Sequence, residues 1–227
     1  MTGPNAGRRM EGVTGPHAGQ PLLTAGAPAK AANGALVCCH GRGATAQGII
    51  NLLEPVSGHG IAVLAPQARR NRWVPRPATA PQSDNEPWLS SGVDCVAAAL
   101  EQARSIAVPP ERTVVVGFSQ GACVAAEYVR RNPTRYGGLA VLSGLLPGST
   151  DELESTAVGG SLEGTPILIG YGADDPHIDS AHVRKTVQTF ERAGGDVDER
   201  RYPATGHEVT DDEFAAIEAM LEAARSD

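Results

Sequence analysis

Short apolar runs alternate with amphipathic runs along most of this chain. A run of Val, Ile, Leu, Ala or Cys without polar interruptions indicates a strand that is buried on both faces. We predict strands at residues 21–25, 35–39, 61–65, 113–116, 139–143, 166–171 and 197–202. The first of these is predicted to be a short edge strand.

The runs between these strands carry apolar residues at helical spacing. Between residues 180 and 193, for example, Val183, Val187 and Phe190 share one helix face. We predict helices at residues 44–57, 88–107, 122–131, 180–193 and 211–224. Strands that alternate with helices in this order predict an α/β fold, with a mostly parallel central sheet and helices on both faces.

The segments outside this alternation are predicted to be loops or flexible chain. Residues 1–18 are rich in Gly, Pro and Arg without periodicity, which predicts a flexible N-terminal extension. Residues 66–88 form a Pro-rich loop, and the loop at 145–164 is too short for a separate lid domain. We therefore expect one α/β domain over residues 19–227, with an open site.

The charge balance disfavours several classes of partner. A net charge of −7 and a pI near 5.4 argue against binding to nucleic acid or to an anionic membrane surface. No apolar run approaches the roughly 18 residues of a membrane span, and no apolar signal-peptide region stands near the N-terminus. We expect a cytoplasmic protein that does not insert into membranes.

The four cysteines do not have the spacing of a disulfide framework or a zinc site. Cys38 and Cys39 are adjacent in a predicted strand, so their side chains point to opposite faces. Cys95 and Cys123 fall in predicted helices. We expect all four to be small buried residues in a reducing compartment.

The pentapeptide Gly117-Phe118-Ser119-Gln120-Gly121 lies between a predicted strand and a predicted helix. A G-x-S-x-G sequence at such a junction makes a tight turn that holds the serine hydroxyl outside the sheet in a strained backbone conformation. The glycines are required because side chains there would collide with the strand or the helix. Ser119 is therefore the candidate nucleophile. The competing interpretation is a glycine-rich turn with a solvated serine.

A serine hydroxyl becomes nucleophilic when a histidine takes its proton and a buried carboxylate orients that histidine. In this type of fold the chain order is serine, acid and base, so the candidates lie downstream of Ser119. His207 follows the last predicted strand and is the candidate base. His182 is expected to be solvated on the polar side of a helix, whereas His177 lies in the acid loop and is a candidate to line the pocket.

Two adjacent aspartates, Asp174 and Asp175, follow the strand at 166–171. Either carboxylate can point to His207 while the other caps the turn. A mechanism with paired carboxylates is disfavoured, because neighbouring side chains in a loop diverge. The residues alone leave the choice between the two aspartates open.

An oxyanion that develops on the substrate needs two backbone N–H donors. The N–H of Gln120, directly after the candidate nucleophile, is one of them. The other is expected from the segment His40–Ala44, where glycines let the chain turn so that the Arg42 N–H faces the site. His40 itself is predicted to be a packed structural residue.

These motifs resemble the phospholipase/carboxylesterase branch of the α/β-hydrolase fold, which includes acyl-protein thioesterases and small bacterial and archaeal carboxylesterases. The resemblance spans about residues 35–210. It implies that Asp175, which precedes a proline, is the acid, and that Arg42 and Gln120 supply the oxyanion donors. It also implies hydrolysis of esters or thioesters without a metal or a cofactor. The matching segments are His40–Gly43, Asn85–Trp88, Gly117–Ala122, Leu142–Pro147, Gly172–Pro176 and Gly206–His207.

Two positions depart from the acyl-protein thioesterases that this chain resembles. Ala44 stands where those proteins usually carry Asp, and Arg42 stands where they usually carry an apolar residue. Both departures favour the microbial carboxylesterases and disfavour lipidated proteins as substrates.

Several apolar side chains near the predicted site are candidates to line a substrate pocket. Trp73 and Trp88 lie in the Pro-rich loop, and Leu145 and Leu146 follow the strand at 139–143. With His177, these residues form the predicted substrate-binding set. The competing interpretation has both tryptophans packed onto the body of the domain.

The sequence therefore predicts a serine carboxylesterase that cleaves short-chain or aryl esters through an acyl-enzyme. An acyl thioesterase or lysophospholipase-type activity is the alternative, because the same catalytic groups serve both reactions. A non-catalytic binding protein with this fold is a further alternative. The expected partner is a small-molecule ester, and the oligomeric state stays open, a homodimer included.

Overall fold

The computed structural model describes residues 7–155 and 159–226. Their strands form one sheet in the order β1-β2-β4-β3-β5-β6-β7-β8. β2 pairs antiparallel with both of its neighbours, and every pairing from β4 to β8 is parallel. The strands are β1 Arg8–Arg9, β2 Pro21–Gly26, β3 Gly34–Cys39, β4 Ile61–Pro66, β5 Thr113–Phe118, β6 Gly138–Leu142, β7 Pro166–Gly172 and β8 Asp196–Tyr202.

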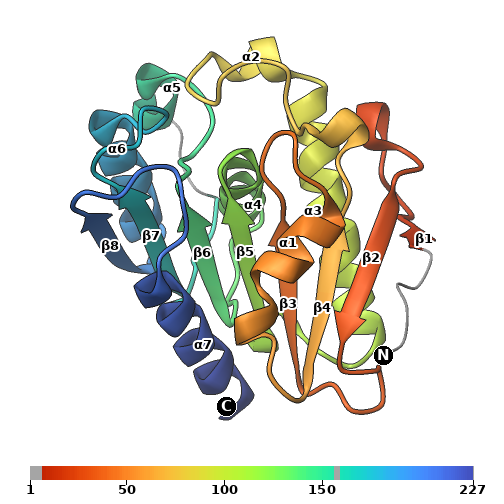
Figure 1. Ribbon diagram of the computed structural model, residues 1–227. Helices are drawn as coiled ribbons and strands as arrows, with labels where there is room; N and C mark the ends of the chain where they lie inside the picture. Colours follow the sequence, from red (N-terminus) through yellow and green to blue (C-terminus); the bar gives the residue numbers. More distant parts are fainter. Residues whose placement is uncertain (1–6, 156–158, 227) are drawn as a thin grey trace.

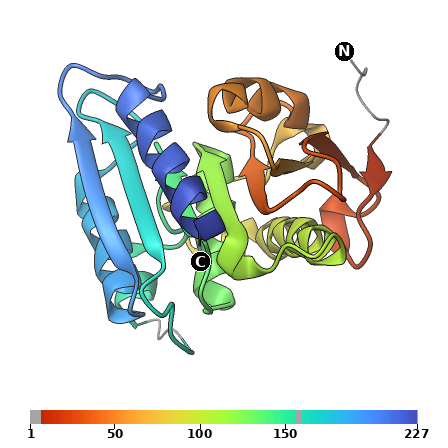
Figure 2. The same ribbon diagram turned by 90° about the horizontal axis from the view of Figure 1, so that it is seen from below.

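Helices cover both faces of this sheet (Figures 1 and 2). α1 (Ala46–Leu52) and α7 (Asp211–Ser226) pack on one face. α3 (Trp88–Ser105), α4 (Gln120–Arg131) and α6 (Ser180–Arg192) pack on the other. The described segments also contain the short helices α2 Gln82–Asn85 and α5 Thr150–Ser155, and 3-10 turns at Gly15–His17, Glu54–Val56, Arg69–Asn71 and Pro110–Arg112.

The apolar strands are buried on both faces, as their unbroken hydrophobic sequence predicts. In β3, Val37 belongs to the core beneath α3 and α4, whereas its neighbours Leu36 and Cys38 belong to the core beneath α1 and α7. The four cysteines are free and buried, as expected. Burial raises the pKa of the Cys39 thiol to about 12 and that of the Cys123 thiol to about 11.

The N-terminal part of the chain differs from the prediction. Residues 1–18 were expected to be a flexible extension, but residues 8–17 pack onto the domain, with Met10, Val13 and His17 buried. The pair Arg8–Arg9 also adds a strand outside β2, so β2 is not an edge strand. These contacts join residues far apart along the chain, which a local periodicity does not reveal. Residues 1–6 lie outside the described part of the chain.

Two predicted segments have different boundaries in the structure. The helix expected at 44–57 is limited to α1, which begins after the N-cap Thr45 and stops before Pro55. The loop expected at 145–164 contains the short helix α5. No helix in the described segments has the length and apolar character needed to cross a membrane.

Candidate active site

Ser119 lies at the sharp turn between β5 and α4. Its backbone has φ 55° and ψ −124°, a conformation that non-glycine residues rarely adopt. A Cβ at Gly117 would stand 2.4 Å from the Cα of Ala122, and a Cβ at Gly121 would stand 2.2 Å from the carbonyl oxygen of Cys39. Both positions therefore require glycine so that strand and helix can approach closely enough to make the turn.

Ser119, His207 and Asp175 form one chain of hydrogen bonds. Nε2 of His207 lies 2.9 Å from Oγ of Ser119, and Nδ1 lies 2.7 Å from Oδ2 of Asp175. The three residues follow β5, β8 and β7, whose carboxyl ends meet at one edge of the sheet (Figure 1). The fold thus brings together all three residues of the predicted serine, histidine and carboxylate set.

The structure distinguishes the two neighbouring aspartates. Asp175 is 6% exposed, and besides its contact with His207 it accepts a hydrogen bond from the His177 N–H at 2.9 Å through Oδ1. The side chain of Asp174 is exposed, while its backbone N–H donates to the Thr205 carbonyl. The carboxylate that contacts His207 is therefore the one that the resemblance implies.

Two rings flank the imidazole of His207. The centroid of Phe118 lies 4.9 Å from it, at an interplanar angle of 41°, and that of His177 lies 5.0 Å away at 75°. The structure therefore places His177 beside the candidate base. The sequence singled out His177 from its position in the acid loop, but the ring contact of Phe118 depends on the turn at Ser119 and has no sequence signal.

The two predicted oxyanion donors belong to two turns that meet at Ser119. Gln120 is the first residue of α4, so its N–H has no acceptor within the helix. The loop after β3 approaches Ser119 closely, since a Cβ at Gly41 would be 3.4 Å from the Cβ of Ser119. Arg42 follows in this loop, and in the described part of the chain no residue accepts a hydrogen bond from its backbone N–H.

The carbonyl of Val74 joins these two donor-bearing turns. It accepts hydrogen bonds from Nε2 of Gln120 at 3.0 Å and from Nη2 of Arg42 at 3.1 Å. The preceding N–H of Trp73 donates to Oε1 of Gln120 at 2.6 Å, and its indole N–H donates to the His40 carbonyl at 2.7 Å. The segment Trp73–Val74 therefore fixes both turns relative to each other, a role that the sequence did not reveal.

Most of the predicted pocket residues are buried. Trp73 and Leu146 are fully buried and Leu145 is 2% exposed, so these side chains do not line an open pocket. Trp88 is half-buried, and its ring packs against His17 and the Arg72 guanidinium. Both tryptophans thus pack on the domain body. Their partners, the His40 carbonyl for Trp73 and the His17 ring and Arg72 guanidinium for Trp88, lie far from them in the sequence or carry no sequence signal.

His182 is also buried, contrary to the expectation that it is solvated. Its Nε2 lies 3.0 Å from the Leu146 carbonyl, and the hydroxyl of Thr186 accepts from the Leu146 N–H on the same side of α6. The polar side of this helix therefore forms hydrogen bonds with the backbone N–H and carbonyl of Leu146, after β6. Burial lowers the pKa of His182, which favours the neutral ring.

His40 is packed, as predicted. Its Nδ1 lies 2.8 Å from the Gly41 carbonyl, and its Nε2 accepts from the Ala68 N–H at 3.1 Å. These contacts fit a neutral imidazole, and burial lowers its pKa. Within the described residues, no group of three or more His, Cys, Asp or Glu side chains is arranged to hold a metal ion.

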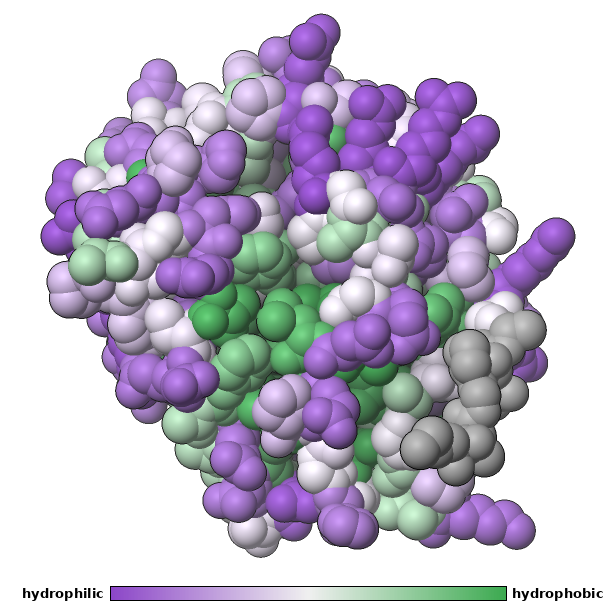
Figure 3. Space-filling model, in the orientation of Figure 1, coloured by the Kyte–Doolittle hydropathy of each residue, from purple (hydrophilic) through white to green (hydrophobic). Residues whose placement is uncertain are grey.

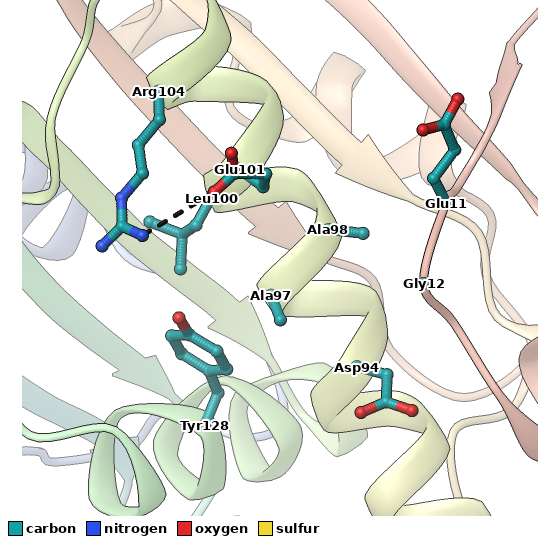
Figure 4. A pocket seen from close by; sticks show the side chains of 9 residues that line it. All are labelled: Glu11, Gly12, Asp94, Ala97, Ala98, Leu100, Glu101, Arg104 and Tyr128. Carbon is teal, nitrogen blue, oxygen red and sulfur yellow. Dashed lines mark ion pairs between the residues drawn. The ribbon is translucent and has the colours of Figure 1, made fainter.

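A separate depression of about 270 Å³ lies between the N-terminal segment and α3. Figure 4 shows Glu11, Asp94 and Glu101 around it, with Tyr128 reaching toward it from α4. None of its lining residues belongs to the hydrogen-bonded chain at Ser119. This depression is therefore distinct from the candidate active site.

The sequence model of the phospholipase/carboxylesterase family matches residues 24–224. The chain belongs to this family. A solved phospholipase/carboxylesterase from Dyadobacter fermentans is 32% identical and has a TM-score of 0.83, with 92% of this chain and 99% of that chain covered. The resemblance expected from the motifs and the α/β-hydrolase fold are both confirmed.

Two curated relatives match this family member over shorter segments. A probable carboxylesterase SOBER1-like of Arabidopsis thaliana is 28% identical over 148 residues, which cover 64% of this chain and 55% of the relative. Acyl-protein thioesterase 1 of Debaryomyces hansenii is 30% identical over 116 residues, which cover 51% of this chain and 49% of the relative. The chain thus spans about half the length of the curated relatives it matches.

Proposed function

We propose that this protein is a serine carboxylesterase that hydrolyses short-chain or aryl carboxylic esters through an acyl-enzyme. The observation that carries the proposal is the chain of two hydrogen bonds, of 2.9 and 2.7 Å, that links Ser119, His207 and Asp175. The family supports it, since the solved relative from Dyadobacter fermentans is named a phospholipase/carboxylesterase. In this proposal residues 19–227, with residues 8–17 packed onto them, form the catalytic domain. The four free buried thiols favour a cytoplasmic location.

The first half of the reaction transfers the acyl group to Ser119. The N–H at Nδ1 of His207 donates a hydrogen bond to Asp175, so the proton stays on Nδ1 and Nε2 is free to accept the proton of the Ser119 hydroxyl. The serine oxygen attacks the ester carbonyl, and the negative oxygen that forms accepts hydrogen bonds from the backbone N–H groups of Arg42 and Gln120. His207 then gives the proton to the leaving alcohol as the carbon–oxygen bond breaks.

The second half returns Ser119 to its starting state. A water molecule gives a proton to Nε2 of His207 and attacks the acyl carbon, and the same two N–H groups stabilise the second oxyanion. When the bond to Ser119 breaks, the proton on His207 passes to the serine oxygen. Asp175 stabilises the imidazolium in both halves and does not itself become protonated.

Thioester hydrolysis is the second candidate function. It is favoured by the similarity to acyl-protein thioesterase 1 of Debaryomyces hansenii. The same three side chains and the same two N–H donors serve an oxygen or a sulfur leaving group. The ratio of kcat/KM for an oxygen ester and the thioester with the same acyl group separates the two candidates.

Replacement of the nucleophile tests the proposal. In Ser119→Ala the hydroxyl is lost, and we expect kcat for 4-nitrophenyl butyrate to fall by about 10⁴ or more. Ser226→Ala is the matched control, because Ser226 is exposed at the end of α7. Circular dichroism and thermal unfolding should show that both variants fold.

Active-site labelling separates catalysis from simple binding. We expect one fluorophosphonate molecule per chain, attached to Ser119 in a mass-spectrometric peptide map. A folded wild-type protein that neither reacts with the fluorophosphonate nor cleaves the ester would support the non-catalytic binding protein instead. Undiminished hydrolysis by Ser119→Ala would refute the proposal.

A further inference from the structure

Arginine residues are concentrated beside the loop that carries one oxyanion donor. The chain has 26 acidic and 19 basic residues in total, yet the eight residues from Arg69 to Arg76 contain four arginines and no acid. Arg42 adds a fifth guanidinium from the loop after β3. Arg42, Arg70 and Arg76 are exposed, and we call these three the arginine rim.

Backbone contacts hold the rim next to Ser119. Gly41, whose Cβ position would be 3.4 Å from the Cβ of Ser119, directly precedes Arg42. The Arg42 guanidinium donates to the carbonyls of Val74 at 3.1 Å and Arg76 at 3.5 Å. The next residue in the loop, Gly43, donates its N–H to the Asn71 carbonyl at 2.7 Å, which brings the neighbouring Arg70 to the same loop.

The charge of the rim is not neutralised by carboxylates. The partners of the Arg42 guanidinium are carbonyl oxygens, and within the described residues no ion pair involves any of the three rim arginines. By contrast, Arg130 and Arg131 on α4 both pair with the buried Glu127. The rim therefore keeps its positive charge in a protein of net charge −7.

Most of the exposed acidic groups around the site lie away from the rim. Asp174 and Glu208 are exposed on the loops that carry the acid and the base. On the rim side, Asp84 follows in α2, and Glu86 binds Ser90 and Arg131. Figure 3 shows long hydrophilic side chains gathered along the upper edge, the end at which Figure 1 places α2 and the loop after β4. The site thus has a positive side at the oxyanion loop and a negative side at the loops of the acid and the base.

We propose that the arginine rim binds an anionic group of the ester substrate, so that this site prefers esters carrying a carboxylate over neutral esters of the same size. The inference rests on the proposed esterase function. A guanidinium offers a planar fork of donors that matches a carboxylate, and three such charges attract an anion that the net charge of the protein would repel. The occupant is an ester of a dicarboxylic acid or of a hydroxy acid.

Two pairs of substrates test the rim and distinguish these two sources of the carboxylate. 4-Nitrophenyl hemisuccinate and 4-nitrophenyl butyrate differ by a carboxylate on the acyl part. 4-Acetoxybenzoate and 4-acetoxybenzamide differ by a carboxylate on the leaving group. The quantity measured is the ratio of kcat/KM for the anionic and the neutral ester, compared between wild type and variant so that the intrinsic reactivity of each ester cancels.

We expect Arg42→Met, Arg70→Gln and Arg76→Gln each to lower this ratio, in at least one substrate pair, by about fivefold at low ionic strength. The loss should shrink in about 0.5 M NaCl, because salt screens exposed charges. Arg70→Gln serves as the variant that is safest for folding, since its side chain makes no hydrogen bond with the described residues. Arg112→Gln is the matched control, because Arg112 precedes β5 at the opposite end of the sheet from Ser119.

The outcomes are distinguishable. If wild type hydrolyses the neutral esters and all rim variants keep the ratio within about twofold, the rim does not recognise anions and the esterase proposal stands. An equal loss in Arg112→Gln would also overturn the inference, because it would show a general charge effect. If wild type cleaves no ester of either pair, the proposed function itself is refuted.

Discussion

The two adjacent aspartates offer a sharp test of the proposed mechanism, because they differ in one hydrogen bond. In Asp175→Asn, an amide replaces the carboxylate that lies 2.7 Å from Nδ1 of His207. If the amide NH₂ faces Nδ1, the ring must carry its proton on Nε2 and can no longer accept the proton of Ser119. If the amide is turned, its NH₂ faces the N–H of His177, which donates to Asp175 at 2.9 Å in the wild type. The first orientation therefore removes the base at Nε2, and the second sets the amide NH₂ against the His177 N–H.

The size of the effect follows from the charge that is lost. A carboxylate and an imidazolium about 4 Å apart attract by about 4 kcal/mol at an effective dielectric constant of about 20. This energy corresponds to about a thousandfold in kcat, since each 1.4 kcal/mol is about tenfold. The unfavourable tautomer adds to this, so we expect a loss of about 10³ to 10⁴ in kcat for Asp175→Asn.

The assay is kcat for 4-nitrophenyl butyrate at saturating ester, with thermal unfolding as the check on folding. Asp174→Asn is the matched control, because Asp174 is exposed and its contact with Thr205 is made by the backbone N–H. We expect it to change kcat by less than about threefold. If Asp174→Asn is the more damaging substitution, the assignment of Asp175 as the acid is refuted.

Three further properties can be measured. Gly121→Ala should destabilise the fold by several kcal/mol or abolish it, because its Cβ would stand 2.2 Å from the Cys39 carbonyl. Gly48→Ala, at an exposed position of α1, should instead stabilise the fold by about 0.5–1 kcal/mol, and equal melting temperatures of the two variants would contradict this. All four cysteines should resist a thiol reagent such as Ellman's reagent until denaturant is added, because they are buried, and rapid native labelling would show otherwise. Burial lowers the pKa of His17, His40 and His182, so below about pH 6.5 the unfolded chain binds more protons than the folded one. The free energy of unfolding, measured with urea, should therefore fall between about pH 7 and pH 5.5, and a constant value would contradict this.

Features that depend on neighbours along the chain could be predicted from the sequence. The strand Thr113–Phe118, the turn at Ser119 and the helix Gln120–Arg131 follow from an apolar run, a G-x-S-x-G motif and a small-residue amphipathic run. The position of His207 after the last strand followed from the chain order that this fold imposes. Motifs of this kind also indicated the family, which the match over residues 24–224 confirmed.

The choice of Asp175 over Asp174 depended partly on the sequence and partly on the tertiary structure. The residues alone left both open, and the proline that follows Asp175 indicated the family pattern. The contact itself became visible only in the structure, where the loops after β7 and β8 meet at the sheet edge and Oδ2 of Asp175 reaches His207. The catalytic roles of these residues stay predictions for the assays described above.

Only the tertiary structure decided which polar and aromatic side chains are buried. His182 bonds the Leu146 carbonyl, Trp73 bonds the His40 carbonyl, and His17 lies 3.0 Å from the Trp73 carbonyl. Every residue carries a carbonyl, so the sequence contains no signal for which one a distant side chain will meet. Periodicity determines the face of a strand or helix that is buried, but contacts between loops depend on where the folded backbone brings those carbonyls together.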